Sequence, residues 1–116
     1  MSDEGYNGWK NYPTWCVNLW LANEQYLSEI ALEIAQHEEQ AASTCEQVRV
    51  GFWTLEQAQR FNTADALKYF VNERSEDVFE DAGMAADLYG WALDHVDWHE
   101  IADAWLETAR EAREYA

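Results

Sequence analysis

The sequence predicts an all-α single domain of about four to six helices, and three observations carry this prediction. The chain has 116 residues, which fits one domain, residues 1–116, with one modest core. Apolar residues recur at spacings of three and four along much of the chain, as they do on the inner face of a helix. The one proline, Pro13, stands where it can begin a helix instead of breaking one.

The composition combines a large negative charge with many aromatic residues. There are 23 acids and 7 bases, giving a formal net charge of −16, together with seven Trp, six Tyr and four Phe. Disordered acidic chains are poor in aromatic residues, so this composition indicates a folded chain. The charge repels nucleic acids and anionic lipid, and the scattered Lys and Arg form no basic patch. We therefore expect a cationic protein partner and no direct contact with nucleic acid.

The start of the chain and its cysteines indicate a cytoplasmic protein. Residues 1–5 lack the basic start and the apolar run of a signal peptide. No apolar stretch approaches the ~20 residues that cross a bilayer, so no membrane contact is expected. Two cysteines, Cys16 and Cys45, are too few for a disulfide framework, and Cys16 is expected to be a buried thiol.

The first part of the chain predicts an irregular lead-in and two helices. Residues 1–12 contain several Gly and Asn residues, which favour irregular structure. Pro13 then begins a helix that ends near Asn23. A second helix follows, and its inner face is formed by Tyr26, Leu27, Ile30, Ala31, Ile34 and Ala35. Its glutamates lie largely on the opposite, solvated face.

The middle of the chain leaves two alternatives open. Residues 42–53 show no helical period, and their Val and aromatic residues around Gly51 favour a short extended segment near residues 48–53. Thr54 and Gln57 have the spacing of a capping box, which predicts that a helix begins there. Because Thr63 offers a second cap, residues 54–74 form either one helix or two.

The last third predicts a short helix and a final, strongly amphipathic helix. Gly83 marks a break, and a short helix around Leu88 and Trp91 follows it. Asp97 and Glu100 have the capping-box spacing at the start of the last helix. Its inner face is formed by Trp98, Ile101, Ala102, Trp105, Ala109 and Ala112, and carboxylates occupy the opposite face.

No motif in the chain predicts catalysis, a metal site or a cofactor. His99 and Glu100 begin a pattern that resembles part of a zinc-protease helix. That chemistry needs two His one turn apart as ligands, with the Glu acting as base. The second position here is Asp103, and no third ligand is apparent. We therefore expect a protein that is not an enzyme.

The tryptophans can form either a core or an aromatic binding surface. The residues concerned are Trp9, Trp15, Trp20, Trp91, Trp98 and Trp105. The helical spacing of several of them favours a core. Trp9 and Trp53 lie outside the predicted helices, so these two are the candidates for exposed aromatic contacts.

The acidic C-terminal half is the strongest candidate for a functional surface. From Glu73 to Glu107 there are eleven acids and one base, Arg74. On the last helix the carboxylates repeat every ~5–6 Å of axis, whereas one DNA strand presents a phosphate about every 3.4 Å. Nucleic-acid mimicry would therefore need several elements on one face. The candidate partner-binding residues are Glu76, Asp77, Glu80, Asp81, Glu100, Asp103, Glu107 and Glu111. The alternative is an ordinary solvated helix face.

The segment from Asn11 to Glu24 resembles the pattern NYxTWxVxLWLxNE found in small proteins of phages, plasmids and some archaeal and bacterial genomes. Residues 63–67 and 96–102 are similar to later blocks of the same family, although Pro13 and Cys16 stand where Glu and Asn are commoner. The family has no settled biochemical function, so the resemblance implies a context of mobile DNA. Residues 96–102 are also similar to the end of ArdA-type antirestriction proteins, which are acidic DNA mimics.

Two functional hypotheses follow. In the first, the chain is an inhibitor from a mobile genetic element, of the anti-restriction or anti-CRISPR type. Its carboxylates would pair with the Lys and Arg that hold phosphates in a nucleic-acid-binding host defence complex. In the second, it is a non-catalytic accessory protein that binds through an aromatic surface, and its acidity reflects solubility or salt adaptation. The oligomeric state and the identity of the partner stay open.

Overall fold

The computed structural model describes residues 5–78 and 83–114, with side chains for 5–74 and 83–114. The order of elements is α1 (Tyr12–Asn23), α2 (Gln25–Ala41), the 3-10 turn η2 (Ala42–Thr44), α3 (Glu46–Arg49), α4 (Leu55–Val78), α5 (Met84–Asp94) and α6 (Trp98–Glu114). The described residues contain no β-strand, only an isolated bridge between Tyr6 and Trp9. The predicted all-α fold is confirmed.

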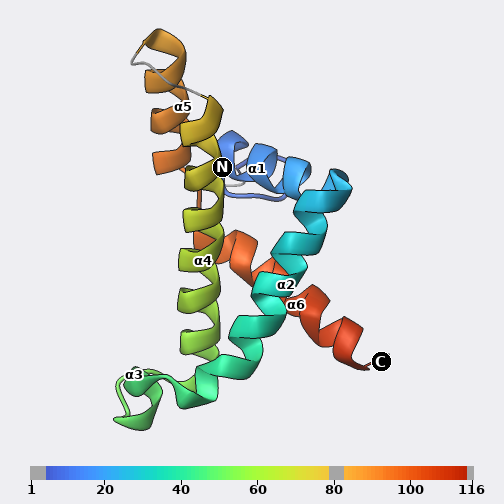
Figure 1. Ribbon diagram of the computed structural model, residues 1–116, viewed down its shortest axis with the longest axis vertical. Helices are drawn as coiled ribbons and strands as arrows, with labels where there is room; N and C mark the ends of the chain where they lie inside the picture. Colours follow the sequence, from blue (N-terminus) through green and yellow to red (C-terminus); the bar gives the residue numbers. More distant parts are fainter. Residues whose placement is uncertain (1–4, 79–82, 115–116) are drawn as a thin grey trace.

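Three helices pack against one another to form the centre of the domain. In Figure 1, α2 and α4 form two arms joined by η2 and α3 at the lower end, and α6 crosses both of them. The helix α1 packs on α2 at the upper, open end, while α5 lies beside α1 and the C-terminal end of α4. This arrangement leaves α1 and α5 on the outside of the domain.

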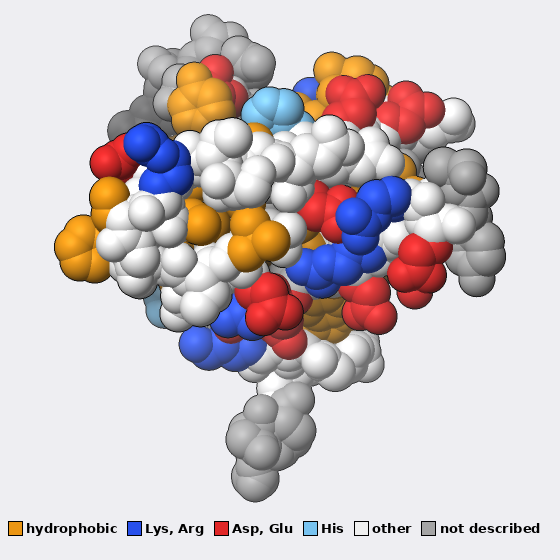
Figure 2. All heavy atoms as spheres, turned by 90° about the horizontal axis from the view of Figure 1, so that it is seen from below, with side chains coloured by type: hydrophobic (Ala, Val, Ile, Leu, Met, Phe, Trp, Pro, Cys, Tyr) orange, Lys and Arg blue, Asp and Glu red, His pale blue; other side chains and the backbone are white. Residues whose placement is uncertain are grey.

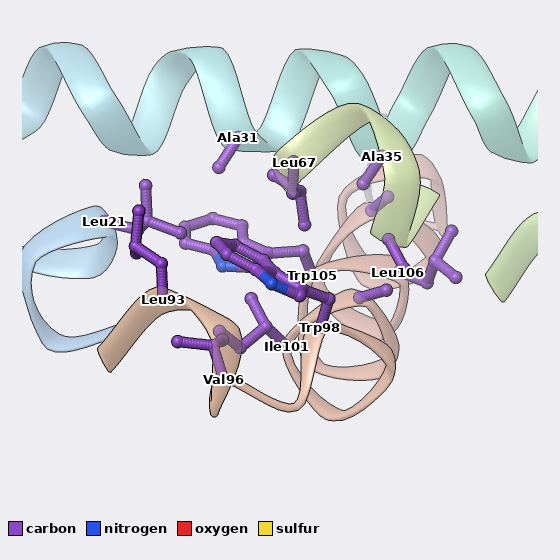
Figure 3. Packing of buried hydrophobic residues seen from close by; sticks show 13 residues of the cluster. Leu21, Ala31, Ala35, Leu67, Leu93, Val96, Trp98, Ile101, Trp105 and Leu106 are labelled. Carbon is purple, nitrogen blue, oxygen red and sulfur yellow. The ribbon is translucent and has the colours of Figure 1, made fainter. Parts of the chain in front are cut away.

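Small residues on α2 allow large residues of α6 to come close. Ala31 and Ala35 have no exposed surface, and they lie above the rings of Trp98 and Trp105 in the core (Figure 3). Leu67 of α4 belongs to the same cluster and packs there with the residues of α2 and α6. Small and large side chains together fill a core as densely as a crystal is packed. The alanines of α2 therefore leave the space that both tryptophans occupy.

Side-chain caps start three of the helices, and the one at Asp97 is the cap that the sequence predicts. The Asn11 carboxamide accepts a hydrogen bond from the backbone N–H of Thr14 at 3.0 Å, one residue before α1 begins. The Glu24 carboxylate accepts from Leu27 N at 3.2 Å and starts α2 directly after α1. At α6, Asp97 Oδ1 accepts from Glu100 N at 3.2 Å. Each cap satisfies a backbone donor that the helix itself cannot pair.

The start of α4 has the predicted reciprocal capping box. Thr54 N donates to Gln57 Oε1 at 2.9 Å, and Gln57 N donates to Thr54 Oγ1 at 3.1 Å. We expect Thr54→Ala to lower the free energy of unfolding by about 1 kcal/mol, because one helix-end donor loses its partner. Urea denaturation followed by circular dichroism measures this change. The control Ser43→Ala, at an exposed serine of η2, should have almost no effect; equal losses in both variants would contradict the capping role.

The extended segment expected near residues 48–53 is wrong. Val48 lies in α3, and Gly51 has a φ of +87°, in the left-handed region that reverses the chain. The backbone N–H groups of Phe52 and Trp53 then turn back to Gln47 O at 2.9 and 3.1 Å. No neighbouring strand in the described part of the chain offers a ladder for this segment, so its backbone bonds are made locally.

Residues 55–74 belong to one helix, α4, which Thr54 caps, and the second possible cap, Thr63, lies inside it. Thr63 is completely buried in the middle of α4, facing the core.

The predicted break at Gly83 is observed, since α5 begins directly after it. In the described part of the chain, no helix combines the length and the apolarity that crossing a membrane requires.

Candidate functional site

Two polar residues fix the start of α1 against the link between α5 and α6. Thr14 Oγ1 donates to Asn11 Oδ1 at 2.6 Å and accepts from Asp97 N at 2.8 Å. The Asn11 side-chain amide donates to the backbone oxygen of His95 at 2.7 Å. Because Thr14 is fully buried, the two bonds of its hydroxyl group are shielded from water, and together with the Asn11 bond they set the position of α1.

The middle of α1 is held by α6. Trp105 Nε1 donates to Asn18 Oδ1 at 2.8 Å, and Leu21 is buried one turn further along. Thr14, Asn18 and Leu21 are spaced four and three residues apart, so they form one inward face of the helix. The outward face of α1 is therefore the one that carries Tyr12 and Trp20, which are 53% and 63% exposed.

An apolar surface results, which we call the α1–α5 face. It consists of Tyr12, Cys16, Val17, Trp20, Phe70, Leu88, Tyr89 and Trp91. One cleft, of about 480 Å³, lies between α1 and α5 beside Tyr12, Leu88 and Trp91. A second, of about 300 Å³, lies between α1, α2 and α4 beside Trp20 and Phe70. The two clefts share Cys16, Val17 and Tyr89 in their linings, so they lie side by side, and we call the pair the hollow.

Two exposed rings of this face, those of Trp91 and Tyr12, are held in place by aromatic neighbours. The ring of Trp91, which is 57% exposed, packs on His95 with 4.1 Å between ring centroids. The ring of Tyr12 lies 5.1 Å from that of Tyr6 and 5.6 Å from that of Trp15. Rings that are already oriented lose little conformational freedom when a partner covers them, so these two are preorganised for contact.

The exposed aromatic surface of this face is as large as the binding patches of many monomers. Tyr12, Trp20 and Trp91 are each more than half exposed. With roughly 150–250 Å² per aromatic side chain, these three rings alone expose on the order of 350 Å². The largest apolar patch of a typical monomer covers about 300–600 Å² and often marks a binding site. The α1–α5 face lies within that range before its aliphatic residues are counted.

The core prediction is confirmed for Trp98 and Trp105, which are buried, and is wrong for Trp20 and Trp91; the expected exposure of Trp9 and Trp53 is also wrong. Trp9 is half-buried and packs against the core, and Trp53 packs edge-on against Phe61 at 5.0 Å. The exposed tryptophans are Trp20 and Trp91, which lie within helices. The spacing of Tyr12, Cys16 and Trp20, four residues apart each, is the sequence signal for this outward face.

Two tyrosine hydroxyl groups of the face stay protonated at neutral pH. Burial raises the pKa of Tyr89, against the opposing effect of the Arg74 guanidinium. The charge that Cys16 carries when ionised raises the pKa of Tyr12. The cysteine itself is half-buried rather than buried as expected.

The predicted acidic stripe of α6 is partly engaged with bases. Glu100 is half-buried and accepts from the backbone N–H of Lys10 at 3.0 Å. Asp103 pairs with Arg60 Nε at 2.9 Å, and both side chains are about half exposed. Figure 2 shows acidic and basic side chains next to one another on the face seen from below. Glu107 and Glu111 are exposed and remain the outward carboxylates of the stripe.

Two further bases near the end of α6 turn towards a buried acid. Arg113 Nη2 and Arg110 Nε lie 3.2 and 3.8 Å from Glu39 Oε2, and the Glu39 side chain is only 7% exposed. These arginines join α6 to α2 and reduce the local negative charge. The other four predicted residues, Glu76, Asp77, Glu80 and Asp81, have side chains outside the described residues.

The incomplete zinc-protease pattern is not assembled in the fold. His99 packs against Phe61 with ring centroids 5.1 Å apart, while Glu100 and Asp103 have the separate partners given above. Nowhere in the described part of the chain do three or more His, Cys, Asp or Glu residues gather at metal-binding distance.

The sequence profile of a family of unknown function (DUF7249) matches residues 2–111. The chain belongs to this family. No curated protein and no solved structure matches it. The match covers every helix from α1 to α5 and most of α6, so the α1–α5 face lies entirely within the family region.

Proposed function

We propose that this chain is a non-catalytic protein-binding domain that holds its partner on the α1–α5 face. The exposure of Trp20 and Trp91 beside two adjoining apolar clefts carries this proposal. Tryptophan and tyrosine are the residues that most often dominate binding energy at protein interfaces. Both cysteines are free, in keeping with a reducing compartment, and we place the protein in the cytoplasm.

The double variant Trp20→Ala/Trp91→Ala tests this proposal. Host proteins are captured on the immobilised wild-type domain and identified, and the purified partner is then titrated calorimetrically against each variant. Loss of two central aromatic contacts should weaken binding by about a hundredfold or more. Phe52→Ala is the matched control, because Phe52 is 81% exposed at the far end of the domain and should not affect binding. Unchanged affinity in the double variant would overturn the proposal.

The second candidate is mimicry of nucleic acid by the acidic surface. It draws on the net charge of −16, on the exposure of Glu107 and Glu111, and on the resemblance to proteins of phages and plasmids. In this case the target would be a nucleic-acid-binding complex of a host defence system. Asp103 and Glu100 contribute less than the sequence suggests, because each already has an interaction within the domain.

Charge reversal separates the two candidates. Under mimicry, Glu107→Lys/Glu111→Lys should abolish binding, and the affinity of the wild type should fall steeply with salt. Under the proposed function, the same variant should lower the affinity only slightly, because those residues lie away from the α1–α5 face. A partner lost in the lysine variant but retained by Trp20→Ala/Trp91→Ala would establish the acidic surface as the binding site.

A further inference from the structure

The apolar centre of the α1–α5 face is bordered by carboxylates. Asp87 and Asp94 are exposed and lie one helical turn before and after Trp91 on α5. Glu73 stands one turn after Phe70 on α4, and the exposed Glu24 follows α1, where its backbone N–H donates to Trp20 O and its carboxylate caps α2. Residues three or four apart share a helix face, so Asp87, Asp94 and Glu73 each lie next to an apolar contact residue.

The one base that lines the hollow, among the described residues, is engaged with aromatic rings. The Arg74 guanidinium lies 5.9 Å from the centroid of Tyr26 and 5.7 Å from that of Phe70. This cation–π arrangement extends the apolar floor of the second cleft. At physiological salt the Debye length is about 8 Å, so the acids closest to the hollow dominate the charge that a docked segment meets.

From this geometry we infer that the occupant is a basic amphipathic helix of a partner protein, an inference that rests on the proposed function. The apolar stripe of the helix would fill the two clefts, and its flanking Lys and Arg would face the bordering carboxylates. Tyr12 and Trp20, at the two ends of the hollow, are eight residues apart on α1, about 12 Å along its axis. Two turns of a partner helix, with apolar anchors at i, i+3, i+4 and i+7, span this length.

The negative charge of the chain argues against two other occupants of this face, a second copy of the chain and an anionic membrane. A second copy of the chain would bring two acidic borders and two net charges of −16 together, which like-charge repulsion disfavours. An anionic membrane surface is repelled for the same reason. A partner segment with a cationic border satisfies both the apolar clefts and the acids around them.

Three designed peptides test the inference. The first, of about 15 residues, carries Leu at helical spacing and Lys elsewhere, giving about four helical turns. The second replaces every Lys with Glu, and the third contains the same Leu and Lys in an order that destroys the apolar stripe. Fluorescence anisotropy with labelled peptides at about 0.15 M salt gives the affinities. We expect the Leu–Lys helix to bind at least about tenfold more tightly than either of the others.

Matched variants of the protein locate the binding site. Asp87→Asn/Asp94→Asn and Glu107→Gln/Glu111→Gln each remove two negative charges, the first pair beside Trp91 and the second on α6. Only the first pair should weaken the Leu–Lys peptide, by about three- to tenfold. Trp20→Ser/Trp91→Ser should weaken it by about tenfold or more, and Phe52→Ser should leave it unchanged.

The outcomes separate failure of this inference from failure of the proposed function. If the Glu peptide binds as tightly as the Lys peptide, or if both charge variants weaken binding equally, a basic helix is not the preferred occupant. If the chain forms a dimer in sedimentation equilibrium that Trp20→Ser/Trp91→Ser dissociates, the face is covered by a second copy. In each of these cases the natural partner can still bind through Trp20 and Trp91. The proposed function is overturned only if the natural partner binds the Trp20→Ala/Trp91→Ala variant with unchanged affinity.

Discussion

Trp105→Ala is expected to lower the free energy of unfolding by about 3–5 kcal/mol, a large part of the stability of a domain of this size. Trp105 is only 8% exposed and lies at the centre of the cluster formed by α2, α4 and α6 (Figure 3). The substitution leaves a cavity that the surrounding helices cannot fill, and it removes the hydrogen bond from Nε1 to Asn18. Urea denaturation followed by circular dichroism measures the change.

Two controls divide this effect into its parts. Trp91→Ala removes the same side chain from a site that is 57% exposed, so the expected loss is below about 1 kcal/mol. Asn18→Ala keeps the Trp105 ring and removes only its hydrogen-bond acceptor, which should cost about 1–3 kcal/mol. Equal destabilisation by Trp105→Ala and Trp91→Ala would contradict the division between core and exposed tryptophans.

Thr14→Val is expected to lower the free energy of unfolding by about 1–3 kcal/mol, although valine has almost the same shape as threonine. The buried hydroxyl accepts from Asp97 N at 2.8 Å and donates to Asn11 at 2.6 Å. Without it, the backbone N–H of Asp97, a half-buried donor just before α6, loses its partner. Chemical denaturation measures the loss, and faster hydrogen exchange of the Asp97 amide shows that the bond itself is responsible.

The control for Thr14→Val is Thr108→Val on α6. Thr108 is exposed, and its hydroxyl bonds only to the carbonyl oxygen of Ala104 one turn earlier in the same helix. We expect a change within about 0.5 kcal/mol. If Thr14→Val is no more destabilising than this control, the hydrogen bonds around Thr14 do not position α1, and the geometry of the α1–α5 face has another origin.

The helices and their caps could be predicted from the sequence because their causes are local. Pro13 begins α1, Thr54 and Gln57 form the capping box of α4, and Asp97 caps α6. Each depends on side chains within one turn of the backbone groups that they satisfy. The turn at Gly51 was predicted as an extended segment, because a short apolar stretch shows its conformation only when the presence or absence of a neighbouring strand is known.

The ion-pair partners of the acidic residues could not be predicted from the sequence. Asp103 pairs with Arg60, which is 43 positions away, and Glu39 pairs with Arg113 across the α2–α6 packing. The sequence gives the total of 23 acids and 7 bases but not which charges meet. The sequence therefore correctly predicted that the carboxylates of α6 share one helix face. It did not predict that some of them have partners within the domain.

The sequence by itself determined that this chain is an acidic, aromatic-rich, all-α domain, because composition and helical period are properties of the chain alone. Only the tertiary structure decided which face of α1 is buried. On α1, Thr14 and Leu21 face α6, and Tyr12 and Trp20 are left outside, although both faces carry apolar residues. The choice depends on contacts with residues more than 80 positions away, Asp97 and Trp105, which no local pattern of α1 contains.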